Sequence, residues 1–126
     1  MATYAQITSI VASPVSQIEG GLVNIQITIK NIHSAQITVM AHGSLDLGVI
    51  PMESFECYPS TYTLNPGGTV TFGGGFYMPN KKVTVHGYSL WYGADQAFHY
   101  DDDKSVVVNL TSVATFSNLS VAYSKL

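Results

Sequence analysis

The chain has 126 residues, of which 46% are apolar and only 10% are charged, and its net charge is −3. This length fits one domain with a real hydrophobic core, and the charge content lies far below the roughly 25% of an average soluble domain. All five basic residues are lysines, and so weak a basic character argues against a nucleic-acid-binding protein. We find no apolar run of the roughly 18 residues that span a membrane, and no signal peptide at the start.

The first half of the chain predicts three strands. Residues 3–12 alternate between more and less apolar positions and predict a strand that Ser13-Pro14 ends. Residues 22–32 carry the clearest signal, because a strict period of two is typical of a half-buried strand. A turn at residues 31–34 leads to a third strand, which begins at Ile37 and fades near Gly43.

The alternation is lost between residues 44 and 63. Pro51 and Pro59 exclude a long central strand here, so we expect a crossover with one or two short strands. Cys57 lies in this predicted loop. It is the single cysteine of the chain and therefore has no intrachain disulfide partner. It is either a buried, inert thiol or the site of an intermolecular bridge.

Residues 64–91 organise the second half of the chain. Residues 65–68 read Asn-Pro-Gly-Gly and predict a turn, followed by a short strand at 69–72 that three glycines at 73–75 interrupt. These glycines allow a bend or bulge, or the close approach of another backbone. A second turn at 78–80 precedes a strand that runs to Trp91.

The C-terminal part predicts a hairpin and two further strands. A turn at 93–95 forms the hairpin tip, residues 101–103 form a charged break, and residues 105–110 form a strand. A last alternating strand at 114–123 follows a domain that already looks complete.

Seven or eight strands with short turns and no helical periodicity predict an all-β fold. We expect an antiparallel immunoglobulin-like β-sandwich, with a jelly roll as the alternative. The sandwich domain spans residues 1–110, and residues 111–126 form a C-terminal arm that extends the sandwich or pairs with a neighbouring subunit.

Four segments resemble the immunoglobulin-like modules of the CARDB type. They read GLVNIQITIKN, LNPGGTVTF, KVTVHGYSLW and DDDKSVVVNL, and the likeness covers roughly residues 7–110. The shared features are an Asn turn after a strand, a Leu-x-Pro-Gly segment and an acidic turn before the last strand. The resemblance implies a non-enzymatic module of a surface, adhesive or virion protein.

The sequence contains few motifs that indicate chemistry. Asp101, Asp102 and Asp103 form the only acidic cluster and are the one candidate for Ca²⁺, but consecutive acids point to opposite sides of an extended chain. A solvated turn is the favoured interpretation. The four histidines lack zinc-site spacing, and neither a nucleophile elbow nor a phosphate loop is present. We therefore expect no enzyme activity and no cofactor.

Aromatic residues are the more informative candidates for a site. One group surrounds the predicted hairpin and could stack on sugar rings or anchor a protein partner, unless Trp91 lies in the core with tyrosines at its rim. Two sequons, at Asn109 and Asn118, matter only if the chain is exported. The candidate interface or ligand-binding residues are Tyr88, Trp91, Tyr92, Phe98, Tyr100, Phe116, Leu119, Val121 and Tyr123.

The sparse charge suggests a function. A surface of Ser, Thr, Asn, Gln, Tyr and Gly is easily desolvated and suits contact with protein. We expect a structural protein of a virion (capsid or decoration protein) or of a surface filament, located in the virion, outside the cell or on its surface. It would form homo-oligomers or bind other structural subunits through neutral faces and β-edge pairing. The alternative is a glycan-binding or adhesive module that uses the aromatics near Trp91.

Overall fold

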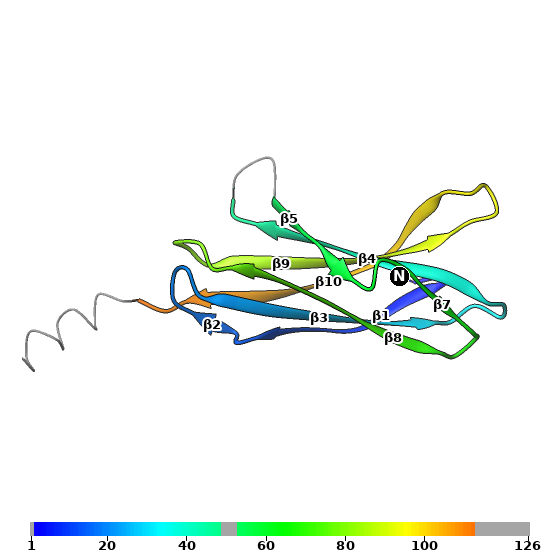
Figure 1. Cartoon of the computed structure of the whole chain (residues 1–126), viewed down its shortest axis with the longest axis horizontal. Coiled ribbons are helices and arrows are strands. Elements are labelled where there is room, and N and C mark those ends of the chain that lie inside the picture. The colour runs from blue at the N-terminus through cyan, green and yellow to red at the C-terminus, as the bar shows by residue number, and fades with distance from the viewer. Residues whose placement is uncertain (1, 49–52, 113–126) are drawn as a thin grey trace, which may run out of the picture.

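The computed structural model describes residues 2–48 and 53–112, which form two packed β-sheets (Figure 1). No helix occurs in these ranges, so none there could span a membrane. The all-β prediction is confirmed. Four of the ten described strands are short, and six have nine or more residues. The strands are β1 (Ala5–Ser13), β2 (Ser16–Gln17), β3 (Leu22–Asn31), β4 (Ile37–Asp46), β5 (Glu53–Phe55), β6 (Cys57–Tyr58), β7 (Tyr62–Leu64), β8 (Thr69–Tyr77), β9 (Val83–Tyr92) and β10 (Phe98–Leu110).

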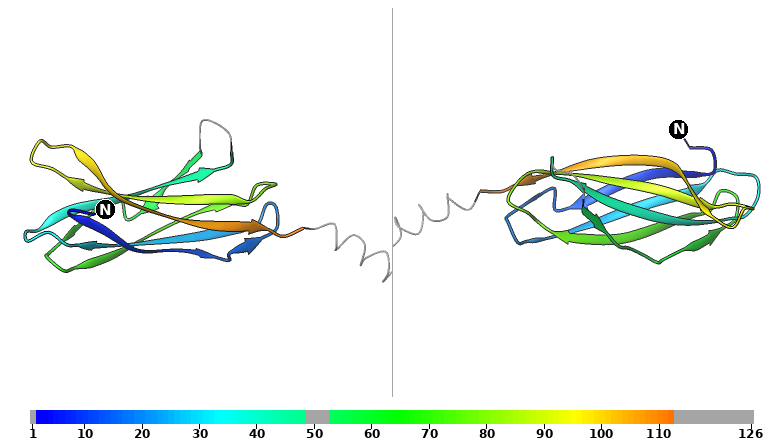
Figure 2. Two further views of the ribbon diagram at one scale, coloured as in Figure 1. Left: turned by 180° about the vertical axis from the view of Figure 1, so that it is seen from behind. Right: turned by 90° about the horizontal axis from the view of Figure 1, so that it is seen from above.

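The two sheets form the layers of a sandwich (Figure 2). One sheet has the order β1-β3-β8-β6, and the other has the order β2-β10-β9-β4-β5, with β7 also paired to β4. All these pairs are antiparallel except β2 with β10. Adjacent antiparallel strands around one core give the predicted sandwich. The predicted arm lies outside the described residues from position 113 onward.

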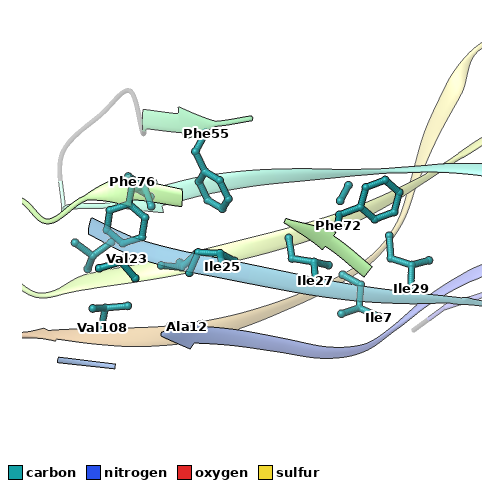
Figure 3. Close-up of a cluster of buried hydrophobic side chains, with 14 of the residues drawn as sticks. Ile7, Ala12, Val23, Ile25, Ile27, Ile29, Phe55, Phe72, Phe76 and Val108 are labelled. Carbon is teal, nitrogen blue, oxygen red and sulfur yellow. The ribbon is translucent and has the colours of Figure 1, made fainter. Parts of the chain in front are cut away.

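The core lies between the inner faces of the sheets, as the alternation of β3 predicts. Every second side chain of β3, from Val23 to Ile29, is almost fully buried (Figure 3). The opposite sheet contributes Val39, Val85 and Val108, which are equally inaccessible. Burial of this kind contributes roughly 1.5–3 kcal/mol per large aliphatic side chain relative to its exposure.

The predicted turn at residues 65–68 is confirmed. The amide of Gly68 donates to the carbonyl of Asn65 over 2.9 Å, and Gly67 has a φ of 80°. Proline at the second position and a left-handed glycine at the third are the requirements of a type II turn. This turn joins β7 of one sheet to β8 of the other.

Asn31 connects this turn to the end of β3. Its side chain is fully buried, and its Nδ2 donates to the carbonyls of Ala35 and Leu64, each over 2.9 Å. Its Oδ1 accepts from the amide of His33, which fixes the predicted turn at residues 31–34. The buried amide is therefore hydrogen-bonded at both its nitrogen and its oxygen, as burial of a polar group requires.

Two expectations about the middle of the chain are corrected. Strand β4 does not fade near Gly43 but continues to Asp46, and the crossover holds three short strands rather than one or two. Cys57 lies in one of them, β6, and not in a loop. The glycines at 73–75 do not interrupt a strand, because β8 continues through them to Tyr77.

The glycines instead allow close approach of another backbone, which was one of the two predicted roles. A Cβ on Gly74 would lie 2.6 Å from the carbonyl oxygen of Glu56 and within 3 Å of the Phe55 ring. A Cβ on Gly73 would meet nothing within 4 Å. The fold therefore requires glycine at position 74 but not at position 73.

We expect Gly74→Ala to lower the free energy of unfolding by about 1–3 kcal/mol, because the added methyl group overlaps a backbone carbonyl. Gly73→Ala is the matched control, and it should leave this energy unchanged or raise it by up to about 1 kcal/mol. Urea denaturation of both variants measures the difference. Equal losses would contradict the assigned contact.

The predicted charged break at residues 101–103 is wrong. These aspartates lie within β10, whose pairing with β9 shifts by one residue between Tyr100 and Asp102. Such a β-bulge reorients the side chains that follow it. The residues therefore form part of the sheet rather than a solvated turn.

The bulge directs two carboxylates toward the start of β1. The Asp101 carboxylate accepts hydrogen bonds from the amides of Thr3, Tyr4 and Ala5 at 2.6–3.1 Å. Asp102 accepts a further one, over 2.8 Å, from the amide of Ile7. We call these two residues and their four amide donors the carboxylate clamp. It joins an edge of one sheet to an edge of the other.

A buried hydroxyl supports the clamp. Ser89 is inaccessible to solvent, and its Oγ donates to the carbonyl of Ala5 over 2.6 Å. The same oxygen accepts from the amide of Asp102 over 3.0 Å. The irregular backbone at the bulge is thus hydrogen-bonded through a side chain from the neighbouring strand.

We expect Asp101→Asn to lower the free energy of unfolding by about 1–3 kcal/mol, because a neutral amide has one acceptor oxygen and makes weaker bonds to the three amides. Asp103→Asn removes the same charge from an exposed carboxylate and should change this energy by less than about 0.5 kcal/mol. Chemical denaturation compares the two. A similar loss in both would show that the charge matters and the hydrogen bonds do not.

Candidate functional site

The outer face of the larger sheet carries most of the predicted aromatic residues. Alternation along β9 turns Tyr88 and Tyr92 outward, whereas the buried Val83 and Val85 face the core. On β10, Phe98 pairs with Tyr92, and Tyr100 pairs with Leu90, so both also lie on the outer side. Four of the five hairpin aromatics therefore share one face.

Trp91 is the exception. It lies on the inner face of β9, half-buried, where its ring packs 4.1 Å from that of Tyr4 and 5.2 Å from that of His99. These ring contacts attach the start of the chain to the β9–β10 hairpin, next to the carboxylate clamp. The tryptophan thus lies in the sandwich and does not share a surface with Tyr88 and Tyr100.

A cleft of about 570 Å³ opens on the outer face of the larger sheet. In Figure 1, β5 and the β9–β10 hairpin both rise from this face, at opposite ends of the sheet. We call this hollow the tyrosine cleft. Its lining residues come from four strands and are His42, Ser44, Ser54, Tyr88, Tyr100, Asp101, Asp102 and Asp103.

Tyr88 is the centre of the ring contacts in the tyrosine cleft. Its ring centroid lies 6.1 Å from that of His42 on β4 and 6.2 Å from that of His86, with which it is stacked. Tyr100 meets it edge to face at 5.8 Å and is 67% exposed. The cleft therefore combines a supported aromatic ring with an accessible one.

The polar groups of the cleft are mainly oxygen atoms. Ser44 is 6% exposed, and its Oγ has no hydrogen-bond partner within the described part of the chain. Asp103 is exposed, whereas Asp101 and Asp102 are engaged in the carboxylate clamp. Across residues 2–48 and 53–112, no three His, Cys, Asp or Glu side chains converge to hold a metal ion.

The remaining predicted residues lie elsewhere. Tyr92 and Phe98 pack against each other at 5.1 Å near the hairpin tip and do not line the cleft. At that tip, His99 Nε2 lies 2.8 Å from Asp95 Oδ1, and this hydrogen bond lowers the pKa of the Asp95 carboxyl. Beyond the described residues lie Phe116, Leu119, Val121 and Tyr123, together with the sequon at Asn118.

Three cleft residues were not predicted as site residues. His42 pairs with Tyr88, and Ser44 pairs with both His86 of β9 and Ser54 of β5. The two pairings with β9 join residues more than 40 positions apart in the chain. The pairing with Ser54 lies in the region without alternation. The one available signal was the outward parity of His42 on its strand.

Cys57 is a free, half-buried thiol in β6. Burial raises its pKa to about 11. Because the thiolate is the reactive form, the folded protein favours the inert thiol over the intermolecular bridge at neutral pH.

We expect Ellman's reagent to label Cys57 at pH 8 at least tenfold more slowly in the folded protein than in urea, because the raised pKa reduces the thiolate fraction roughly a hundredfold. The rate of thiol release at 412 nm measures this. Equal rates before and after unfolding would contradict the burial of this thiol.

Comparison with known proteins identifies the fold class. No protein-family model and no curated protein matches the chain. The putative ApaA protein from Bordetella pertussis superposes with a TM-score of 0.62 and 16% identity, covering 87% of this chain and 98% of that one. PapD-like domain 7 of human CEP192 gives a TM-score of 0.52 at 9% identity, covering 84% and 87%.

A third similar structure is the alkylpurine DNA glycosylase AlkC of Pseudomonas fluorescens bound to DNA, with a TM-score of 0.64 and 11% identity over 89% of this chain. The chain spans only 32% of that protein's length. At such identities the likeness shows the fold alone. The protein is thus an immunoglobulin-like β-sandwich, as the sequence predicts.

Proposed function

We propose that this protein is a non-enzymatic structural module, of the CARDB type within the immunoglobulin-like sandwiches, that assembles with copies of itself or with other subunits. A virion or a surface filament is the setting that fits it. The single observation that carries the proposal is a nearly uncharged outer face on the smaller sheet, the one built from β1, β3, β8 and β6. This face is called the neutral face below.

The outward residues of the two central strands define the neutral face. Lys30 is its only charged residue among those described on these two strands. Hydroxyl and amide side chains cost far less to desolvate than charges, which favours contact with protein. The residues are Leu22, Asn24, Gln26, Thr28 and Lys30 on β3, and Thr69, Thr71, Gly73, Gly75 and Tyr77 on β8.

The surface shape of the neutral face supports the same function. Gly73 has open space where a side chain would lie, so the monomer itself does not need glycine there. A hollow of about 490 Å³ lies around it, lined in part by Val11, Asn24 and Gln26. Exposed apolar side chains lie on the same face: Val11, which lines the hollow, is 48% exposed, and Leu22 and Tyr77, which pair at the ends of β3 and β8, are 46% and 74% exposed. Hydrophobic groups around a glycine hollow suit the close approach of another chain.

An incompletely covered strand edge offers a second contact. Strand β6 pairs with β8 only at Gly73 and Gly74, and no other described strand pairs with that side of β8. Unpaired amides and carbonyls can accept an additional strand. The predicted strand at residues 114–123 is the segment of this chain that would pair with such an edge in a neighbour.

The test is the size of the full-length protein in solution, measured by sedimentation velocity over a range of concentrations. We expect association that Gly73→Lys abolishes, because this substitution adds length and charge at the centre of the neutral face. Ser105→Lys is the matched control, because Ser105 is an exposed strand residue on the outer face of the other sheet. It should assemble normally. Truncation after Ser112 should weaken association.

Circular dichroism establishes that each variant is folded. A full-length protein that stays monomeric at high concentration would overturn the self-assembly part of the proposal. Equal disruption by Gly73→Lys and Ser105→Lys would overturn the assignment to the neutral face.

A further inference from the structure

We propose that the tyrosine cleft binds a neutral saccharide, with one sugar ring stacked on Tyr100. This site lies on the outer face of the larger sheet and is separate from the neutral face, so it does not depend on assembly. The proposed glycan site is formed by Tyr88 and Tyr100 and does not include Trp91, whose ring packs against those of Tyr4 and His99 on the inner face.

The aromatic side chains of the cleft are preorganised for a ligand by contacts between their rings. Tyr88 contacts the rings of His42 and His86, and Tyr100 stands edge to face with it. Tyr100 is 67% exposed, which leaves its ring available for the C–H groups of a pyranose. Tyrosines combine apolar area with few rotatable bonds, so little entropy is lost when a ligand stacks on them.

The hydrogen-bonding groups of the cleft match hydroxyl groups. Asp103 is exposed, and its carboxylate makes no hydrogen bond or ion pair to any described residue, whereas its backbone amide donates to Asp102; Ser54 supplies an exposed hydroxyl. Beneath them, the Ser44 Oγ is buried and lacks a partner among the described residues. A buried hydroxyl without a partner is costly, and a ligand or a bridging water that reaches it would remove this cost.

The charge of the cleft selects the kind of saccharide. Its lining includes three aspartates, and none of the four described lysines lines it. Carboxylates accept hydrogen bonds from sugar hydroxyls but repel sialic acid, sulfate and phosphate groups. The volume of about 570 Å³ lies within the roughly 300–1,000 Å³ of small-molecule sites. A short neutral oligosaccharide fits these properties best.

The experiment probes the full-length protein with a glycan array that carries neutral, sialylated and sulfated glycans. Titration calorimetry with the neutral oligosaccharide that gives the strongest signal then measures affinity. We expect Tyr100→Ala to weaken binding roughly three- to tenfold, the loss of one stacking contact. Ser54→Trp should abolish binding, because it fills the cleft from an exposed position without removing a stabilising contact.

Tyr77→Ala is the matched control, because Tyr77 is 74% exposed and lies on the opposite sheet. It should bind like the unmodified protein. Three results would overturn the proposal: no neutral glycan bound at millimolar concentration, sialylated or sulfated glycans bound equally well, or binding that survives Ser54→Trp. Gly73→Lys should bind glycans normally, which keeps this test independent of assembly.

Discussion

The β-bulge in β10 is the constraint on which both the closure of the sandwich and its cleft depend. One extra residue between Tyr100 and Asp102 lets Tyr100 and Asp103 lie on the same outer face, although three positions separate them. It also directs Asp101 and Asp102 toward the amides at the start of β1. A regular strand would place these side chains on alternating faces and could not serve both purposes.

The two outer faces of the sandwich differ in chemistry, and this difference supports two roles. The smaller sheet presents amides, hydroxyls and glycines in a broad arrangement, with exposed apolar side chains such as Leu22 and Tyr77. The larger sheet presents rings and carboxylates around a defined hollow. A broad neutral surface suits protein contacts, whereas a concave site with few oriented polar groups suits a small ligand. A structural subunit that also binds a glycan is consistent with both.

The amino-acid sequence predicts the fold but only part of the candidate site. It singled out Tyr88 and Tyr100, yet it grouped them with Trp91, which faces the core. The three aspartates were interpreted as a solvated turn, because consecutive acidic residues point to opposite sides of an extended chain. His42 and Ser44 were not predicted to join them. Their neighbours come from β9 and β5, whose register with β4 no local pattern specifies.

The amino-acid sequence alone determined the strands with strict alternation, the proline-glycine turn at residues 65–68 and therefore the sandwich class. These features follow from local preferences: side chains alternate on a strand, and few residues tolerate a positive φ. Only the tertiary structure decided the bulge, the carboxylate clamp and the membership of the tyrosine cleft. A bulge of one residue reverses the face of every residue beyond it, and strand register is set by partners far away in the chain.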